Sequence, residues 1–170
     1  MKNIKIPDKI NTKLSRILGY YLGDGSYEID RITFFEQREE VAKYYKKLIK
    51  DIFNVDSDLR FRKSKNYWQI RVYSRIISQL FKEVYIERDK THNEKMPPII
   101  LKSSDSSLAA FIGGFFDAEG YVSKSRIAAG FNNGLLARQL QFSLLRLGII
   151  SSISEYVNRK NPYSKNIRYT

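Results

Sequence analysis

The sequence predicts an α+β protein built from two copies of one structural unit, and two observations carry that prediction. A run of helix-compatible apolar residues ends in a carboxylate and a glycine at Gly23-Asp24-Gly25, and again at Ala118-Glu119-Gly120. The two acids lie 95 positions apart, and the same offset pairs Gly19 with Gly114. Strand-like alternation and then an amphipathic helix follow each run. One acid from each copy would therefore reach a shared place.

The first copy reads as α-β-β-α-β-β-α. Asn11 and Thr12 can satisfy the free amide donors of a helix N-terminus, so a helix begins there. Apolar residues at helical spacing predict the other helices, and alternating polar and apolar residues predict the strands. The expected elements are a helix over 11–23, extended segments over 27–36 with a turn near Asp30, a helix over 39–53, strands over 59–62 and 67–73, and a helix over 76–88.

A linker separates this copy from the second. It holds Met96-Pro97-Pro98, where proline excludes a continuous helix, and a Ser/Asp run over 103–107. The expected second copy has a helix over 108–118, a hairpin through 126–131, a helix over 135–147 and strands near 149–157 and 167–169, with a one-residue slip of the repeat near Gly148. No counterpart of the closing helix is visible, so either the second half is naturally short or its end is missing. The halves are predicted as 1–90 and 108–170, joined by a linker over 91–107.

Composition and charge indicate which class of partner the protein binds. The 170 residues are 42% hydrophobic and 14% aromatic, which is typical of a globular domain. Lys and Arg number 30 against 18 Asp and Glu, which leaves a net charge of +12. Such a charge favours a polyanionic partner, most plausibly nucleic acid, although basic proteins also bind anionic membranes or are merely basic.

The chain has no cysteine, which excludes disulfides, thiolate zinc sites and cysteine nucleophiles. The N-terminus lacks the apolar stretch of a signal peptide. No apolar segment approaches the roughly 20 residues that span a bilayer. We therefore expect an intracellular protein, cytoplasmic or organellar, with no membrane partner.

The repeated motif predicts a tight contact between two helices. Gly19 and Gly23 share one helix face, as do Gly114 and Ala118, and such small residues let backbones approach closely. Asp24 and Glu119 would then emerge together, and apposed carboxylates require a cation or a proton between them. Oxygen ligands without cysteine favour Mg²⁺. A lone Asp-Gly pair is usually only a turn, and paired carboxylates also serve glycosidases, but the registered second copy and the positive charge favour phosphodiester chemistry.

These motifs resemble those of the LAGLIDADG homing endonucleases, in the monomeric form with two motif copies. The resemblance covers nearly the whole chain. It implies a pseudo-twofold αββαββα repeat, with the motif helices at the centre and two antiparallel sheets forming a DNA-binding saddle. It also implies that Asp24 and Glu119 bind Mg²⁺ or Mn²⁺, each in a site that cuts one strand, with help from the carbonyls of Gly23 and Ala118. The expected partner is double-stranded DNA with a long, asymmetric target site, cut with a stagger.

Further roles follow from the same resemblance. The family's polar residue after the second strand falls on Gln37 and Asn132, where a solvent-network role and a surface turn are both open. A family lysine in the linker resembles Lys95, whose alternative is a solvated lysine, and Lys124 on the hairpin is a second candidate. Two departures are Leu22, where the family often has an acid, and Glu119 in place of an aspartate.

The strand patterns predict which residues meet DNA. Apolar residues should pack on the helices, so the alternate face remains for the major groove, where Arg and Gln suit guanine and adenine. The residues expected on this face are Arg31, Thr33, Arg60, Arg62, Gln69, Arg71 and Tyr73 in the first half, and Arg126, Asn158 and Arg168 in the second. Those expected to contact phosphate are Lys63, Lys65, Arg159, Lys160 and Lys165.

Two other functions stay open at this point. An RNA maturase or a non-cleaving DNA-binding protein could use the same fold, although the retention of Asp24 and Glu119 favours cleavage. The nuclease domain of an intein is disfavoured, because the chain begins at Met1 and shows no cysteine or splicing block.

Overall fold

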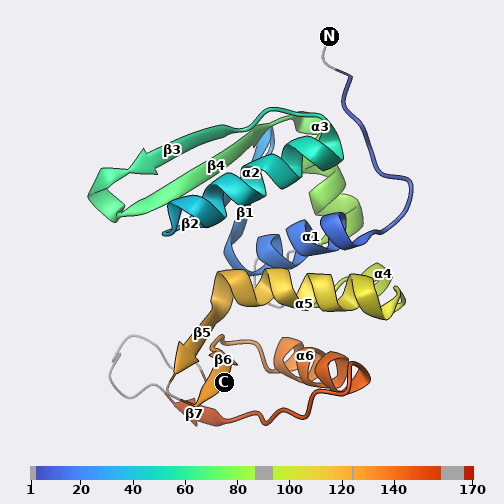
Figure 1. Cartoon of the computed structure of the whole chain (residues 1–170), viewed down its shortest axis with the longest axis vertical. Coiled ribbons are helices and arrows are strands. Elements are labelled where there is room, and N and C mark those ends of the chain that lie inside the picture. Colours follow the sequence, from blue (N-terminus) through green and yellow to red (C-terminus); the bar gives the residue numbers. More distant parts are fainter. Residues whose placement is uncertain (1–2, 87–93, 124, 158–166) are drawn as a thin grey trace.

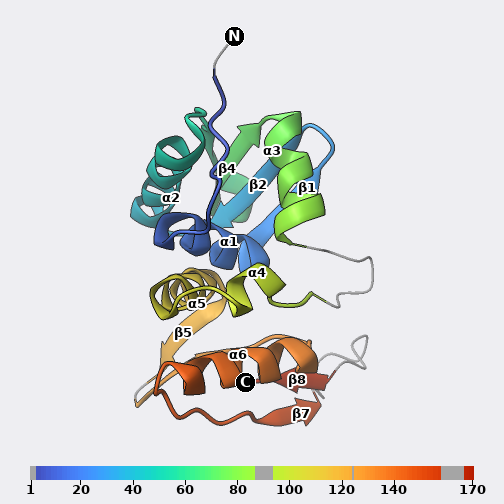
Figure 2. The same ribbon diagram turned by 90° about the vertical axis from the view of Figure 1, so that its right-hand side faces the viewer.

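Two helices lie side by side at the centre of the molecule, with one half of the chain above them and the other below (Figures 1 and 2). The computed structural model describes residues 3–86, 94–123, 125–157 and 167–170. The central helices are α1 (Thr12–Asp24) and α5 (Asp105–Glu119). Each begins at a capping side chain: Asn11 accepts from the Leu14 amide, and Ser104 accepts from the Ser107 amide.

The backbones of α1 and α5 touch through their glycines. A Cβ added at Gly19 would lie 1.9 Å from the carbonyl oxygen of Phe111, and one added at Gly114 would lie 2.1 Å from that of Arg16. Arg16 and Phe111 are themselves 95 positions apart, so the two contacts are related by the same twofold operation. The predicted close helix contact and its pseudo-twofold symmetry are both confirmed.

A four-stranded antiparallel sheet forms the first half. Its strands are β1 (Gly25–Glu28), β2 (Arg31–Glu36), β3 (Asp58–Arg62) and β4 (Tyr67–Tyr73), in the order β1-β2-β4-β3. The helices of this half are α2 (Glu39–Phe53), α3 (Arg75–Leu80) and the π-helical turn η2 (Phe81–Tyr85). Apolar residues of β2 and β4 are buried against the helices, including Phe34, Ile70 and Val72. Phe81 packs at 4.8 Å between ring centroids on Tyr21 of α1, which joins α3 to the central helix.

The second half repeats the same order. Its elements are β5 (Gly120–Ser123), β6 (Arg126–Ala129), α6 (Gly134–Arg146), β7 (Glu155–Val157) and β8 (Ile167–Tyr169). The β5–β6 register pairs Gly120 with Ala129, and the β1–β2 register pairs Gly25 with Phe34, so the offset of 95 holds strand by strand. Phe131 and Tyr169 form a bridge that connects β6 to β8.

The expected one-residue shift in the offset between the two copies near Gly148 is also confirmed. Asn54 ends α2 with φ 53°, and Gly148 follows α6 with φ 77°, both in the left-handed conformation that terminates helices. The two residues are 94 positions apart instead of 95.

The bounds of four elements expected from the sequence differ from the structure. The closing helix expected over 76–88 is α3 followed by η2 and ends at Tyr85. The expected linker contains the short helix α4 (Pro98–Leu101), because proline fits the first turn of a helix, where its missing N–H is not needed. Helix α5 begins at Asp105, because Ser104 caps it.

The strand expected over 149–157 is confined to β7. In the part of the chain that the structure describes, no helix has the length and apolar character to span a membrane.

Candidate metal and nucleic-acid site

The two acids of the repeated motif lie at the same end of the helix pair. Asp24 is the last residue of α1 and Glu119 is the last residue of α5. A Cβ added at Gly23 would lie 2.7 Å from the Cβ of Ala118 and 3.0 Å from the Cγ of Glu119, so the Glu119 side chain passes over the residue next to Asp24. The structure therefore brings both acids together, as the sequence predicted.

This end of the helix pair concentrates negative charge. Helix C-termini carry a partial negative charge, and neither helix has a basic residue in its last turn to offset it. The pKa of Tyr20 is raised by burial, then by Glu36 and in smaller part by the charge of Asp24. A cation at this end would relieve the repulsion between the two carboxylates.

The donor set fits a hard divalent cation. Among the described residues no group of three or more His, Cys, Asp or Glu side chains could hold a metal alone. The available ligands are the carboxylates of Asp24 and Glu119 and the last helix carbonyls, including those of Gly23 and Ala118, which have no intrahelical donor. Mg²⁺ keeps several waters and is typically held by one or two carboxylates together with substrate phosphates. Two acids with carbonyls are therefore enough for Mg²⁺ or Mn²⁺, but not for a closed protein cage.

On the first-half side, a polar network adjoins the ends of the two helices. The buried carboxylate of Glu36 accepts from the Tyr20 hydroxyl at 2.9 Å and from the Arg38 amide at 2.8 Å. The Arg38 guanidinium also donates to the carbonyl oxygen of Asp117 at 2.8 Å. Arg38 therefore ties the loop after β2 to the last turn of α5.

The Asp117 side chain holds the two helices together within this network. Its carboxylate accepts from Arg16 of α1 at 2.5 Å and from the Tyr45 hydroxyl of α2 at 2.6 Å. Burial and the hydrogen bond to Asp117 raise the pKa of Tyr45 above its ordinary value, so Tyr45 stays a donor at neutral pH. Position 117 corresponds to Leu22 in the first motif, so the departure noted in the sequence removes this contact from the other side.

The hydrogen bonds from Arg38 and Tyr20 keep Glu36 ionised. Burial raises the pKa of the Glu36 carboxyl, but the donors outweigh burial, and the net pKa lies below the ordinary value. Sequence reasoning missed Glu36, Arg38 and Asp117. The signal was present for Glu36, which occupies the helix-facing position in the alternation of β2, where an unpaired charge would be costly.

Gln37 and Asn132 occupy equivalent positions in the repeat and both are exposed. Gln37 follows β2 directly, and Asn132 follows the bridge residue Phe131 after β6. Lys95 is exposed in the linker, and the structure anchors its neighbours to α6: the Asn133 side chain donates to the Glu94 carbonyl at 2.6 Å, and the Met96 amide donates to Gln139 at 2.9 Å. The backbone on both sides of Lys95 is thus held against Asn133 and Gln139 of the second half. Lys124 lies outside the described residues.

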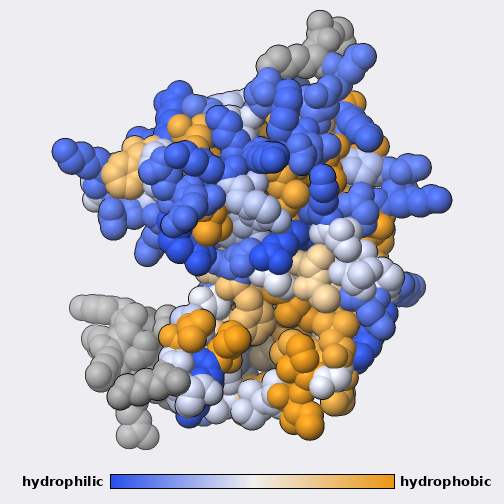
Figure 3. Space-filling view, in the orientation of Figure 1, coloured by the Kyte–Doolittle hydropathy of each residue, from blue (hydrophilic) through white to orange (hydrophobic). Residues whose placement is uncertain are grey.

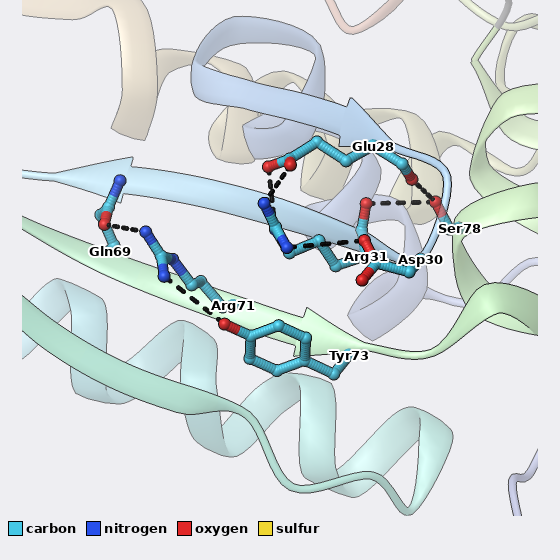
Figure 4. Close-up of polar contacts among 7 residues, drawn as sticks. All are labelled: Glu28, Asp30, Arg31, Gln69, Arg71, Tyr73 and Ser78. Atoms are coloured by element: carbon cyan, nitrogen blue, oxygen red, sulfur yellow. Dashed lines mark hydrogen bonds and ion pairs between the residues drawn. The ribbon is translucent and has the colours of Figure 1, made fainter.

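Predicted basic residues on the outer face of the first sheet are held by hydrogen bonds and ion pairs, and Figure 4 shows Arg31 and Arg71 among them. The Gln69 amide oxygen accepts from Arg71 at 2.8 Å and from Arg62 at 2.8 Å. Arg71 also reaches the Tyr73 hydroxyl at 3.4 Å, and Arg31 pairs with Glu28 and lies over the Tyr73 ring. Because both arginines hold its oxygen, the Gln69 amide nitrogen is left as the donor.

Two residues of this face are less accessible than the sequence predicted. Thr33 is 3% exposed and Gln69 is 7% exposed, because they lie in the middle of the sheet beneath longer neighbours, with Arg71 directly across from Thr33. Neither side chain is free for direct DNA contact without movement of the arginines. The rest of the predicted set remains accessible, since Arg60, Arg62 and Tyr73 are exposed.

The lysines expected to contact phosphate lie at the tip of the β3–β4 hairpin. Lys63 and Lys65 belong to the exposed 3₁₀ turn η1 (Lys63–Lys65). In the second half, Arg126 is exposed at the start of β6. Asn158, Arg159, Lys160 and Lys165 lie outside the described residues, and only the backbone of Arg168 is described, in β8.

The chain was compared with known families, sequences and structures. The LAGLIDADG-like domain family matches residues 11–87 and 106–170. The glutamine–fructose-6-phosphate aminotransferase of Methanocaldococcus jannaschii is 31% identical over 161 residues, which is 92% of this chain and 14% of that protein. The replication factor C small subunit of the same organism is 28% identical over 176 residues, 94% of this chain and 9% of that protein. The chain thus spans a small part of the length of these relatives.

Solved structures share the fold. I-DmoI in complex with DNA and Mn superposes with a TM-score of 0.63 at 18% identity, covering 95% of this chain and 89% of that chain. Full-length DUF199/WhiA from Thermatoga maritima superposes with a TM-score of 0.64 at 14% identity, covering 96% of this chain and 52% of that chain. With the family match over both halves, the paired motif helices and the repeated strand register, the chain belongs to the LAGLIDADG-like domain family.

Proposed function

We propose that this protein is a site-specific, divalent-metal-dependent DNA endonuclease that makes a staggered double-strand cut. The observation that carries the proposal is the convergence of Asp24 and Glu119 at the ends of two helices packed backbone to backbone. A basic sheet face supplies a surface for the duplex, and the net charge of +12 favours a polyanion. The I-DmoI structures, solved with DNA and with Mn or Ca, support the choice of substrate and cofactor.

The chain's own residues would act as follows. Asp24 and Glu119, with the carbonyls of Gly23 and Ala118, would hold the cation. When bound, a divalent cation supplies an activated water and stabilises the leaving oxygen of a phosphodiester. Gln37 and Asn132, which are exposed at equivalent positions of the repeat, would orient water for one strand each. Lys95, whose backbone neighbours are anchored to Asn133 and Gln139, would offset developing negative charge in the second half.

The two proposed cutting sites, one for each DNA strand, would not be equivalent. Arg38 stands where the second half has Asn133, and the Glu36–Tyr20 pair has no polar counterpart across the pseudo-twofold axis. One chain with unequal halves suits an asymmetric target and needs no second subunit. We therefore propose a monomer acting on a long, asymmetric duplex site.

The test is a selection from a random duplex library, with and without Mg²⁺. We expect the wild-type chain to enrich one long site and to cut it only with the metal. Asp24→Asn and Glu119→Gln should each abolish double-strand cutting while keeping DNA binding, because they remove charge without changing shape. Asp51→Asn, which changes an acid on the outside of α2, is the matched control and should cut normally.

Two results would refute the proposal. The first is undiminished cutting by both acid variants. The second is tight, sequence-specific binding by the wild-type chain without metal-dependent cutting, which would indicate a binding protein on this fold or, if RNA is preferred, an RNA maturase.

A further inference from the structure

Two aromatic side chains lie on the outer face of the first sheet, at the end nearer the helix termini. Phe35 is the last residue of β2 on that face, and Tyr67 is the first residue of β4 on it. Their ring centroids are 5.4 Å apart and the angle between the ring planes is 90°. Both residues are half-buried, so part of this aromatic pair stays open to solvent.

The surroundings of this pair are polar. In Figure 3 the first half presents mostly hydrophilic residues, whereas hydrophobic residues gather over the second half. Farther along the outer face, Arg71 lies across from Thr33, and Arg31 donates to Glu28 (Figure 4) and lies over the ring of Tyr73. The face therefore changes from aromatic at one end to arginine-rich at the other.

The aromatic end of the face is the end next to Asp24. Gly25, which follows Asp24 directly, pairs with Phe34 in the register of β1 and β2. The Tyr20 hydroxyl of α1 also reaches the Phe35 carbonyl oxygen at 2.7 Å. The backbone of Phe35 is therefore held by the same helix that ends in Asp24.

The corresponding strand of the second half has no aromatic residue on this face. The offset of 95 carries Phe35 onto Gly130 and Thr33 onto Ala128, so Arg126 is the one long side chain of that series. An aromatic contact from these strand positions to a bound duplex would thus come from the first half alone.

We propose that the Phe35 ring reads the C5 methyl group of a thymine in the major groove, at a base pair close to the cut. Among the four bases only thymine presents a methyl group in that groove. A polar edge of cytosine or adenine facing the ring would lose water without gaining a hydrogen bond, which costs binding free energy. The inference rests on the DNA binding in the proposed function and adds the identity of one base to it.

The strand geometry also orders this base relative to the others. Phe35 and Arg31 are four residues apart, which is about 14 Å along an antiparallel strand, and duplex DNA rises about 3.4 Å per base pair. For a strand that follows the groove, the thymine should lie about four base pairs nearer the cut than the base pair that Arg31 reads.

The test replaces thymine by deoxyuridine, which removes the methyl group and leaves the base-pairing edge unchanged. A duplex is selected from a random library by binding with Ca²⁺, the cation of one solved I-DmoI complex with DNA, and its thymines are replaced one at a time. The positions whose preference Arg31→Ala relaxes mark the first-half part of the site. There we expect one replacement to weaken binding about fourfold, the effect of removing one methyl group from an apolar contact. Phe35→Ala should bind both duplexes equally.

Phe61→Ala is the matched control. Phe61 is an aromatic residue of the same sheet, but it packs on Trp68 and alternates onto the opposite face. This variant should keep the preference for thymine. A second measurement places cytosine at the same position: C5 methylation of that cytosine should strengthen binding by the wild type and not by Phe35→Ala. Changes made in the DNA leave the protein intact, so the wild-type result stands even where Phe35→Ala folds poorly.

The inference is overturned if no thymine in the first-half part of the site responds to deoxyuridine. It is also overturned if Phe35→Ala keeps the discrimination or if Phe61→Ala loses it. Methyl discrimination without metal-dependent cutting would support this inference and overturn the proposed nuclease activity. Metal-dependent cutting without methyl discrimination would do the reverse, and a chain that selects no duplex would overturn both.

Discussion

The Tyr20 hydroxyl donates to the buried Glu36 carboxylate at 2.9 Å, whereas the two residues at the equivalent places in the second half are both phenylalanines. Phe115 and Phe131 meet edge to face, with ring centroids 5.5 Å apart. One backbone framework thus carries a charged hydrogen bond on one side of its axis and an aromatic contact on the other. The two halves share their geometry but differ in the chemistry beside their acids.

Replacing Tyr20 by phenylalanine, or its counterpart Phe115 by tyrosine, should in each case lower the free energy of unfolding. Tyr20→Phe removes a donor from a buried carboxylate, and hydrogen bonds to charged groups contribute about 1.5–3 kcal/mol. Phe115→Tyr places a hydroxyl against the Phe131 ring, and a buried hydroxyl without an acceptor costs about 1–3 kcal/mol. Urea unfolding should show both losses. Tyr44→Phe on the exposed side of α2 is the control and should change the free energy of unfolding little.

Glu36 should make stability depend on acidic pH. Its pKa in the folded protein lies below the ordinary value of 4.5, because its donors outweigh burial. The stabilisation is therefore fully present above pH 4.5 and is lost as the pH falls through the lower folded pKa. Unfolding free energies measured from pH 7 to pH 3 should fall less steeply for Glu36→Gln than for the wild type. An equal slope in both proteins would contradict the assignment, and Glu39→Gln on the surface is the control.

The glycine contact between α1 and α5 should tolerate no side chain. Gly114→Ala would gain about 1 kcal/mol of helix propensity. However, the new Cβ would sit 2.1 Å from the Arg16 carbonyl oxygen, and such overpacking against backbone costs about 1–3 kcal/mol or more. We expect net destabilisation in urea unfolding. At Gly113 the added Cβ meets the Arg16 guanidinium at 2.7 Å and no backbone atom, so Gly113→Ala should cost less than Gly114→Ala. Equal effects at both glycines would refute the contact.

DNA contacts at the hairpin tip and in the sheet should differ in kind. Lys63→Ala and Lys65→Ala should each weaken binding to all sequences and reduce the slope of log K against log salt by about 1, as expected for phosphate contacts. Gln69→Ala should instead relax sequence preference with little change in that slope, because Gln69 is uncharged and its amide oxygen holds the base-reading candidates Arg62 and Arg71 in place. Binding isotherms at several salt concentrations on the selected site and a scrambled site would separate the two. Identical slopes for Lys63→Ala and the wild type would contradict the phosphate assignment.

Much of this architecture could be read from the sequence, because the repeat and the hydrophobic periods are local signals. The motif helices, the first-half strands and the apposition of Asp24 with Glu119 were predicted correctly. The start of α5 was missed, because a Ser/Asp run is also typical of a loop and only Ser104 in place reveals the cap. The π-helical turn after α3 could not be predicted from periodicity, since one extra residue in a turn leaves the apolar pattern almost unchanged.

The candidate site was only partly predictable for a different reason. The contacts of Asp117 with Arg16 and Tyr45 join residues 101 and 72 positions apart, and nothing in the local pattern of either segment indicates the partner. The burial of Thr33 and Gln69 likewise depends on how long neighbouring side chains lie across the sheet. Alternation assigns a residue to a face, but it does not say what covers that face.

The direct passage from each motif helix into its first strand has a mechanical consequence. Gly25 and Gly120 begin their strands immediately after Asp24 and Glu119, so no loop stands between an acid and its sheet. The backbone contacts of Gly19 and Gly114 with the facing helix fix the distance between the two acids. The strand residues that would read bases take no part in those contacts. Under the proposed function, substitutions on the strands could change the recognised sequence and leave the spacing of the two cuts intact. The recognised sequence and the length of the overhang could then change independently of each other during evolution.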